Sequence, residues 1–122
     1  MKIERFEDIN VWKQSRDLVN SIYHFTSKDS FSNDYGLKDQ IQRAAVSIMT
    51  NIAEGFERDN NKEFIRFLIY SKGSAGEVRS LLYVALDLKY INKEEFNEQY
   101  KSAVSVIKQI SKFIKYLRNY TS

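Results

Sequence analysis

The sequence predicts an all-α protein: an antiparallel up-down four-helix bundle that forms one domain over residues 1–122. The chain has no proline and only four glycines, whereas sheet-rich folds use both residue types in their many turns. Apolar residues recur every three or four positions in four long segments, which is the period of an amphipathic helix. A hydrophobic content of 43% with 29% charged residues is typical of a chain that folds around one core.

The four predicted helices cover about 8–27, 37–57, 62–90 and 93–119. Asp8 is a candidate N-cap of the first helix, and Asn92 with Glu95 can form a capping box at the last. The segment "KDSFSNDYG" is rich in Ser, Asn and Asp, so it predicts a loop. Four amphipathic helices joined by short links pack by default as an antiparallel bundle.

The first and last predicted helices carry more apolar residues than one core stripe needs. A second seam at seven-residue spacing runs along each of them, which allows two interpretations: a wide core stripe, or a subunit interface. We favour an interface, and hence a homo-oligomer. The seams comprise Val106, Phe113 and Tyr120 beside Tyr116 in the last helix, and Val11, Leu18 and Phe25 next to Trp12, Val19 and Ile22 in the first.

Polar residues also recur at helical spacing along facing edges of the second and third helices. If the two helices fold back on each other, residues that face one another have sequence numbers with a constant sum. Five complementary pairs meet this condition with sums of 120 or 121, so we predict an interhelical polar ladder that sets the register of the hairpin. The pairs are Arg58 with Glu63, Glu54 with Arg66, Asn51 with Tyr70, Ser47 with Ser74, and Arg43 with Glu77.

Gly55 falls among the apolar positions of the second helix. A glycine inside a helix costs about 0.5–1 kcal/mol relative to alanine, which is expected where two backbones must approach closely. Gly73 and Gly76, near Ser71 and Ala75 in the third helix, fit the same interpretation. A hinge or a notch for a docking partner is the alternative.

Catalytic and metal-dependent functions are not expected. The chain has no cysteine, and its single histidine, His24, has no second histidine with which to share a metal or activate a nucleophile. The stretch "KGSAGE" lacks the ending of a phosphate-binding loop. Glu54 with Glu63 or Glu77 could form a di-metal site, but di-iron bundles need Glu-x-x-His, and each acid here has an arginine nearby. We therefore expect no enzyme activity, no metal and no cofactor.

The N-terminal "MKIERFEDINVW" contains no apolar core of a signal peptide. The longest apolar run, "LLYVAL", is far shorter than the roughly 20 residues that cross a bilayer. A cytoplasmic protein without a membrane segment is expected.

The basic residues are unevenly distributed. The net charge is +3, yet the segment from Gln99 to Ser122 holds five bases and no acid, so the rest of the chain carries 14 bases against 16 acids. Tyr100, Tyr116 and Tyr120 lie among these bases and could stack on nucleobases. The pattern predicts a nucleic-acid-binding face, and a merely solvated cationic face is the alternative. The predicted residues are Lys101, Lys108, Lys112, Lys115 and Arg118.

Three segments together resemble a known family: "FEDINVWKQS", "YGLKDQIQRAAVSIMTNIAEGFER" and "EFIRFLIYSKGSAGEVRSLLYVALDLKYI". They are similar to the 23S rRNA-intervening sequence proteins, over about Phe6 to Ile91. The resemblance implies bacterial origin, an antiparallel four-helix bundle and ring-like homo-oligomers, often pentamers. Related members are the accessory variability determinant proteins of diversity-generating retroelements, basic pentamers that bind nucleic acid and the reverse transcriptase.

Two functions follow as hypotheses. The first is a non-enzymatic oligomeric bundle that binds RNA, DNA or a ribonucleoprotein through its last helix. The second is a protein–protein adaptor or scaffold ring without direct nucleic-acid contact, whose partner could be a nucleic-acid-processing protein.

Overall fold

The computed structural model describes residues 2–120, and every long element in them is a helix. A short 3-10 helix, η1 (Phe6–Asp8), precedes α1 (Asn10–Thr26), and the five-residue α2 (Asp29–Asn33) follows it. The remaining long helices are α3 (Tyr35–Glu57), α4 (Asn61–Asp87) and α5 (Lys93–Asn119). The all-helical prediction is confirmed.

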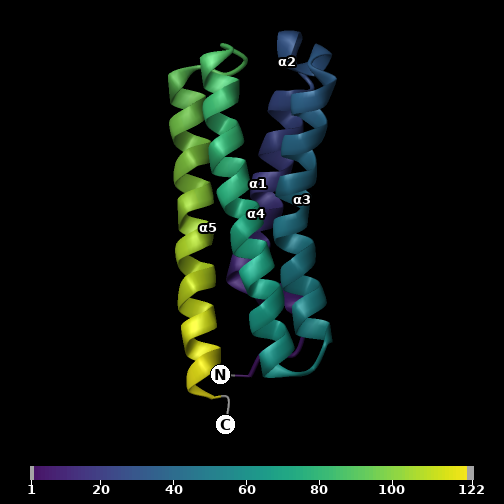
Figure 1. Ribbon diagram of the computed structural model, residues 1–122, viewed down its shortest axis with the longest axis vertical. Helices are drawn as coiled ribbons and strands as arrows, with labels where there is room; N and C mark the ends of the chain where they lie inside the picture. Colours follow the sequence, from purple (N-terminus) through teal and green to yellow (C-terminus); the bar gives the residue numbers. More distant parts are fainter. Residues whose placement is uncertain (1, 121–122) are drawn as a thin grey trace.

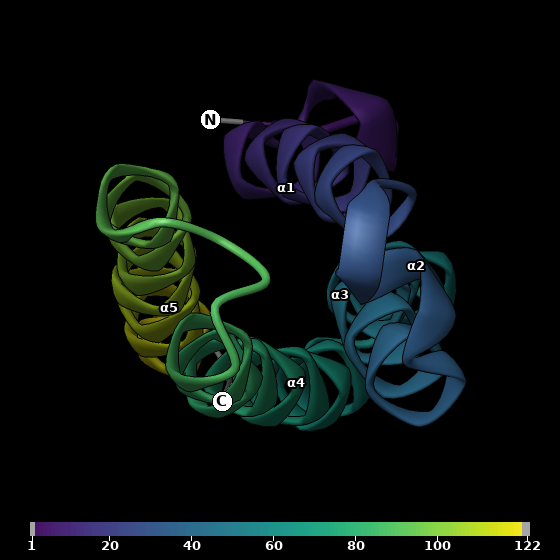
Figure 2. The same ribbon diagram turned by 90° about the horizontal axis from the view of Figure 1, so that it is seen from above.

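The four long helices run side by side as a bundle, with both chain ends at one end of the long axis (Figure 1). Successive long helices are neighbours: α3 packs along α4, and α4 along α5, while α1 contacts both α3 and α5. Viewed along the axis, α4 lies between α3 and α5 and across the bundle from α1 (Figure 2). This order follows from the short turns, which force sequential helices to lie next to each other.

Side-chain caps fix where three of the helices begin. Asn92 accepts a hydrogen bond from the backbone N–H of Glu95, whose carboxylate accepts one from the N–H of Asn92, so the predicted capping box is confirmed. Asn60 caps α4 by accepting from the backbone N–H of Glu63, and Asp34 caps α3 by accepting from that of Leu37. The prediction of Asp8 as the first N-cap is wrong: Asp8 ends η1, and Ile9 precedes α1 without a side-chain cap.

The core runs the length of the bundle. Leu18, Ile48, Leu68 and Ile110, one from each long helix, are at most 1% exposed. The core also takes in residues that we interpreted as possible interface seams: Val11, Leu18, Ile22 and Val106 are all buried in it. The wide-stripe interpretation therefore holds for these positions, because α1 and α5 each contact two neighbours and need apolar residues on two sides.

The predicted loop after α1 contains the short helix α2, which places Phe31 in the core with 2% of its surface exposed. The Phe31 ring stacks on Tyr90 with centroids 5.0 Å apart, and the Tyr90 hydroxyl donates to Asp34 Oδ2 at 2.9 Å. That hydrogen bond raises the pKa of Tyr90 above its ordinary value, because it favours the protonated phenol. Because this segment is mostly polar, its sequence did not indicate that one apolar residue, Phe31, packs into the core at this end of the bundle.

At Gly55 the helices α3 and α4 approach each other closely. A Cβ added there would lie 2.7 Å from Phe67 Cβ and 3.3 Å from the Phe64 carbonyl oxygen. One turn further along, the buried Ser71 hydroxyl donates across the interface to the Ile48 carbonyl at 2.7 Å. The close-approach interpretation is thus confirmed for Gly55. It is wrong for Gly73 and Gly76, since a Cβ added at either would meet no atom within 4 Å.

Candidate nucleic-acid interface

The predicted basic residues lie on the outer face of α5. Lys101, Lys108, Lys112 and Lys115 are exposed, whereas Ala103 and Ile110 on the opposite side are fully buried. At 100° per residue these four lysines occupy an arc of about 60°. Arg118 is exposed at the C-terminal end of the same helix. We call these five residues the lysine face.

Three members of the lysine face line one shallow hollow. Lys101, Lys108 and Lys112 surround a depression of about 540 Å3 whose other walls are Tyr100, Val104, Ser105 and Gln109. Lys115 and Arg118 lie further along the helix and do not line it. The hollow therefore combines three ammonium groups with a hydroxyl and an amide, which is a suitable surface for phosphate oxygens.

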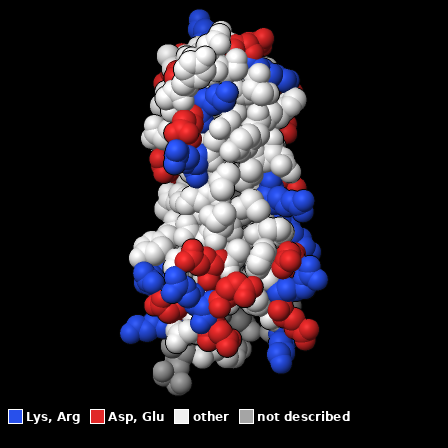
Figure 3. Space-filling view, turned by 90° about the vertical axis from the view of Figure 1, so that its right-hand side faces the viewer, with Lys and Arg blue, Asp and Glu red and all other residues white. Residues whose placement is uncertain are grey.

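No member of the lysine face forms an ion pair with any residue in the range 2–120. The four ion pairs in that range lie elsewhere: Arg5 with Glu7, Arg43 with Asp39, Arg58 with Glu54, and Arg66 with Glu63. By contrast, both signs of charge gather toward the two ends of the face presented by α3, and its middle is largely uncharged (Figure 3). The positive charge of the lysine face thus remains available to an external anion.

A polar junction with α1 fixes one edge of the hollow. The Gln14 side-chain oxygen accepts hydrogen bonds from Ser105 Oγ at 3.2 Å and from Gln109 Nε2. Gln109 also donates to Ser105 Oγ at 3.2 Å. Sequence reasoning did not find Gln14, because nothing in the spacing of a lone glutamine on α1 indicates that it meets α5.

Arg79 of α4 fixes the other edge. Its Nη2 donates to the Tyr100 hydroxyl at 2.7 Å, and its guanidinium carbon lies 5.1 Å from the centre of the Tyr100 ring. The hydrogen bond from Arg79 lowers the pKa of Tyr100 below its ordinary value, since it stabilises the phenolate. Tyr100 also stacks on Phe96, so it is held in place, whereas Tyr116 and Tyr120 are 42% and 68% exposed. Of the three tyrosines that we expected to meet bases, these two are the accessible ones.

One further lysine lies on the side of α4 that faces α5. Contacts of Arg79 with Tyr100 and of Tyr83 with Phe96 set the register of the two helices, with sequence numbers that add to 179. Lys72 lies two turns before Arg79 on the same side of α4, so this register places it level with Ile107. Lys72 is exposed.

The predicted polar ladder forms only in part. Ser47 and Ser74 bond across the helices with 3.0 Å between their hydroxyl oxygens, as predicted. The Asn51 amide donates to Ser47, its neighbour on α3, and Arg43 pairs with Asp39 one turn before it. Glu77 does meet α3, but it accepts from Gln40 at 3.3 Å and not from Arg43.

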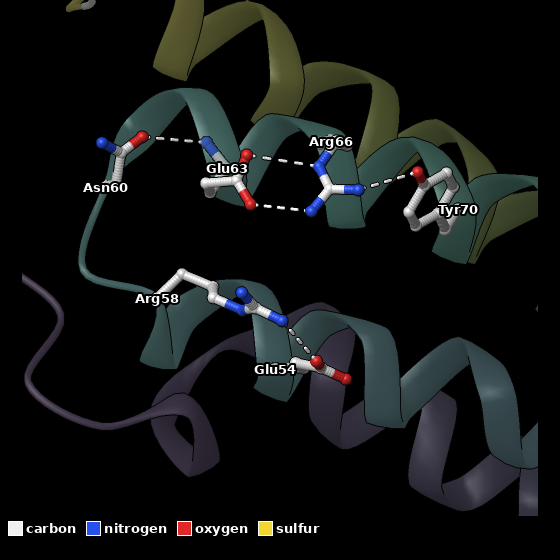
Figure 4. Close-up of polar contacts among 6 residues, drawn as sticks. All are labelled: Glu54, Arg58, Asn60, Glu63, Arg66 and Tyr70. Atoms are coloured by element: carbon white, nitrogen blue, oxygen red, sulfur yellow. Dashed lines mark hydrogen bonds and ion pairs between the residues drawn. The ribbon is translucent and has the colours of Figure 1, made fainter.

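The charged end of the ladder is paired within each helix (Figure 4). Arg58 binds Glu54 on α3 at 2.9 Å, while on α4 Arg66 binds Glu63 at 2.7 Å and donates to the Tyr70 hydroxyl at 3.0 Å. The predicted cross-helix pairs Glu54–Arg66 and Asn51–Tyr70 are therefore wrong. Arg58 and Glu63 form no close ion pair either, although the charge of Arg58 contributes to lowering the pKa of Glu63. Partners three or four residues away on the same helix are already within reach, so these side chains do not need the other helix.

At this end of the hairpin α3 and α4 contact each other through the Phe67 ring and not through close ion pairs. The guanidinium carbons of Arg58 and Arg66 each lie 4.9 Å from the centre of the Phe67 ring. Phe67 is 7% exposed, which shows that the two arginines and their neighbours cover it. Register at this end of the hairpin is therefore set by packing around Phe67 and Gly55.

The Glu63–Arg66 pair makes stability depend on pH. The hydrogen bond from Arg66 lowers the pKa of Glu63 below its ordinary value of 4.5. Because the pKa is lower in the folded state, the pair stabilises the fold above the unfolded-state pKa and loses this effect as the pH falls through the folded-state pKa. We expect Glu63→Gln to be slightly less stable than wild type near neutral pH and equally stable in acid.

Chemical denaturation of both proteins in steps from about pH 7 to about pH 3 measures this difference. Glu57→Gln is the matched control, since Glu57 is exposed on α3 and forms no ion pair. A stability difference that stays constant over the whole range would contradict the assignment.

Between Lys2 and Tyr120 no group of three or more His, Asp and Glu side chains could hold a metal ion. His24 is exposed near the end of α1, with its ring edge-on to Phe25 at 5.6 Å. None of the helices in this part of the chain is long and apolar enough to cross a membrane.

A sequence model of the 23S rRNA-intervening sequence proteins matches residues 7–112. The chain belongs to this family. The match extends past the segments that carried the resemblance and includes most of α5, with three of the five residues of the lysine face. Comparison with curated proteins finds no match.

A solved structure has the same fold. It is a protein of unknown function from the S23 ribosomal protein family of Bacteroides thetaiotaomicron, 22% identical to this chain. The superposition gives a TM-score of 0.80 and covers 86% of this chain and 95% of that one. The family and its bundle fold are thereby established for this chain.

Proposed function

We propose that this protein is a non-enzymatic, homo-oligomeric helical bundle that binds nucleic acid, or a ribonucleoprotein, through the lysine face of α5. The observation that carries the proposal is the set of exposed, unpaired bases, three of which line one hollow with Tyr100, Ser105 and Gln109. A phosphate backbone gains affinity from such a surface because each neutralised phosphate releases condensed counterions. RNA is the first probe to test, since the family is named for an intervening sequence of ribosomal RNA.

Assembly would multiply this surface. The family resemblance implies a ring of subunits, often five, and a ring would repeat the lysine face around its circumference. Several weak sites on one assembly engage one polyanion with a much higher overall affinity than a single site. The modest net charge of one chain is therefore compatible with useful binding by the assembly.

The test is charge reversal on the lysine face. We expect the double variant Lys108→Glu, Lys112→Glu to weaken binding of an RNA oligonucleotide by about tenfold or more at about 50 mM salt, and to reduce the steepness of the salt dependence. Fluorescence anisotropy over about 50–200 mM salt measures both quantities. The matched control is Lys13→Glu, Lys28→Glu, which removes the same charge at exposed positions outside α5.

Equal weakening by the control would show that net charge, and not this face, determines binding. Absence of binding by the wild type at the lowest salt would contradict the proposal and favour the protein–protein adaptor. In that case single-stranded and duplex DNA, tested beside RNA, must give the same negative result.

A further inference from the structure

A second hollow adjoins the lysine face, near the end of the bundle that holds both chain ends (Figure 1). It has a volume of about 540 Å3 and lies between α5 and the start of α1. Sites of roughly 300–1,000 Å3 are the size that encloses a small ligand. We call it the aromatic hollow, and its apolar walls are Ile3, Val11, Phe113 and Tyr116.

The aromatic hollow is continuous with the hollow of the lysine face. Lys112 and Gln109 line both of them, so an anion bound by Lys112 lies at the entrance to the aromatic hollow. Along α5 the row Lys108, Lys112, Tyr116 and Tyr120 advances in steps of four residues, each of which rises about 6 Å. A ligand that follows this row passes from two ammonium groups to two phenol rings.

The rings at the end of this row have surface free for a ligand. Tyr116 and Tyr120 are 42% and 68% exposed, with ring centroids 4.7 Å apart, and the Tyr116 centroid lies 6.5 Å from that of Phe113. Tyr116 and Tyr120 also border a third hollow of about 400 Å3, together with Phe56 and Phe64. Exposed ring faces beside apolar side chains are a surface on which a planar heterocycle stacks.

The polar groups around the aromatic hollow suit the two parts of a nucleotide. On the α5 side, the exposed Lys112 attracts a phosphate. On the opposite side, the exposed Asp8 repels a phosphate but accepts hydrogen bonds from the N–H groups of a base, and Asn10 offers both a donor and an acceptor. Neither Lys112 nor Asp8 belongs to the four ion pairs of residues 2–120, so both charges are available to a ligand.

We infer that the aromatic hollow binds an unpaired nucleobase of a strand whose phosphates lie on the lysine face, and that the protein prefers single-stranded RNA to duplex. The inference rests on the proposed function and names the form of nucleic acid that the lysine face takes. In a duplex the bases are paired and stacked on one another, so its phosphates reach the lysines but its bases do not reach Tyr116. A base of a single strand is free to turn outward and stack on an aromatic ring.

The first test compares three probes of equal length: a single-stranded RNA, the duplex of the same sequence, and a strand in which abasic sugars replace the nucleosides. The abasic strand keeps the phosphates and lacks the bases, and the duplex carries twice as many phosphates as the single strand. We expect the single strand to bind about tenfold more tightly than either of the other probes, because stacking contributes to its affinity alone. Fluorescence anisotropy at about 50 mM salt measures the three affinities.

The second test removes the ring at the aromatic hollow. We expect Tyr116→Ala to weaken binding of the single strand about tenfold, and to leave both the other two probes and the salt dependence unchanged, since no charge is removed. Tyr116→Phe keeps the ring and should bind like the wild type. Tyr23→Ala is the matched control, because Tyr23 is similarly exposed, at 46%, and borders a different hollow beside α3.

The third test locates the base on the unaltered protein, so it does not depend on how a variant folds. A single strand that carries a photoreactive iodouridine is bound and irradiated, and the attached peptide is identified by mass spectrometry. We expect the crosslink at Tyr116 or Phe113. Tyr23 and Tyr35, which are exposed on other helices, should not react.

Three results would overturn the inference: equal affinity for the single strand and for the duplex or abasic strand, an effect of Tyr116→Ala no larger than that of Tyr23→Ala, or crosslinks only outside the aromatic hollow. If the inference alone fails, the Lys108 and Lys112 reversal still weakens binding of all three probes. If the proposed function fails, no probe binds the wild type at the lowest salt, and the inference fails with it.

Discussion

Gly55→Ala is expected to destabilise the protein by about 2 kcal/mol, although alanine is the better helix former. The added methyl would lie 2.7 Å from Phe67 Cβ and 3.0 Å from Phe64 Cδ1, and 3.3 Å from the Phe64 carbonyl oxygen. Two of these contacts involve backbone or Cβ atoms that no rotamer change can move, so α3 and α4 must separate. Urea denaturation monitored by circular dichroism measures the change in the free energy of unfolding.

Gly36→Ala is the control for this substitution. Its Cβ would meet only Asp34 Oδ1, at 3.9 Å, so we expect unchanged stability or a gain of about 0.5 kcal/mol. The substitution Phe67→Ala should not rescue Gly55→Ala, because it keeps the Cβ that causes the clash. An increase in stability on Gly55→Ala would show that the helices can separate at little cost.

Phe67→Ala is expected to cost about 3 kcal/mol, the usual range for a buried phenylalanine. The ring is 7% exposed and lies outside the main core cluster, where Arg58 and Arg66 cover it at 4.9 Å and Tyr70 packs edge-on at 5.7 Å. Truncation removes the apolar contact and the face on which both guanidinium groups rest. The measurement is again the free energy of unfolding in urea.

Phe67→Leu separates volume from aromatic character. It keeps most of the buried apolar volume but no ring face, so we expect a loss of about 1 kcal/mol. The control Ile69→Ala, at an exposed position two residues after Phe67, should change the stability of the isolated chain by less than about 0.5 kcal/mol. A Phe67→Ala loss as small as that would mean that the ring is only a surface residue and that the hairpin is held elsewhere.

The helices themselves could be read from local patterns. The apolar period placed Leu68, Ile48 and Ile110 in the core, and the spacing of Asn92 and Glu95 identified the capping box. Both depend on residues at most four positions apart, so the sequence contains all of the information. The end of α4 was predicted less accurately, at about residue 90. The helix stops at Asp87, because Leu88 is its C-cap and Lys89 adopts a left-handed φ of 62°.

Pairing between helices was predicted less well, because a matching sum of sequence numbers does not say which partner is nearer. Glu54 pairs with Arg58 and Arg66 pairs with Glu63, each on its own helix. The short side chains of Ser47 and Ser74 bond across the interface as predicted, whereas Glu77 accepts from Gln40 and not from the predicted Arg43. Four seam residues, Val11, Leu18, Ile22 and Val106, belong to the core for a related reason, since a sequence shows how wide an apolar stripe is but not how many neighbouring helices cover it.

The lysine face could be recognised from the sequence, since five bases and no acid occur between Gln99 and Ser122. The packing of the helices was needed to show that Gln14 and Arg79 border its hollow, and that Tyr100 is held while Tyr116 and Tyr120 are exposed. It also separated Gly55, pressed against Phe67, from Gly73 and Gly76, which face outward. The physical reason is that helical periodicity assigns each residue to a side of its own helix, whereas the distance to the next helix depends on how the whole bundle packs.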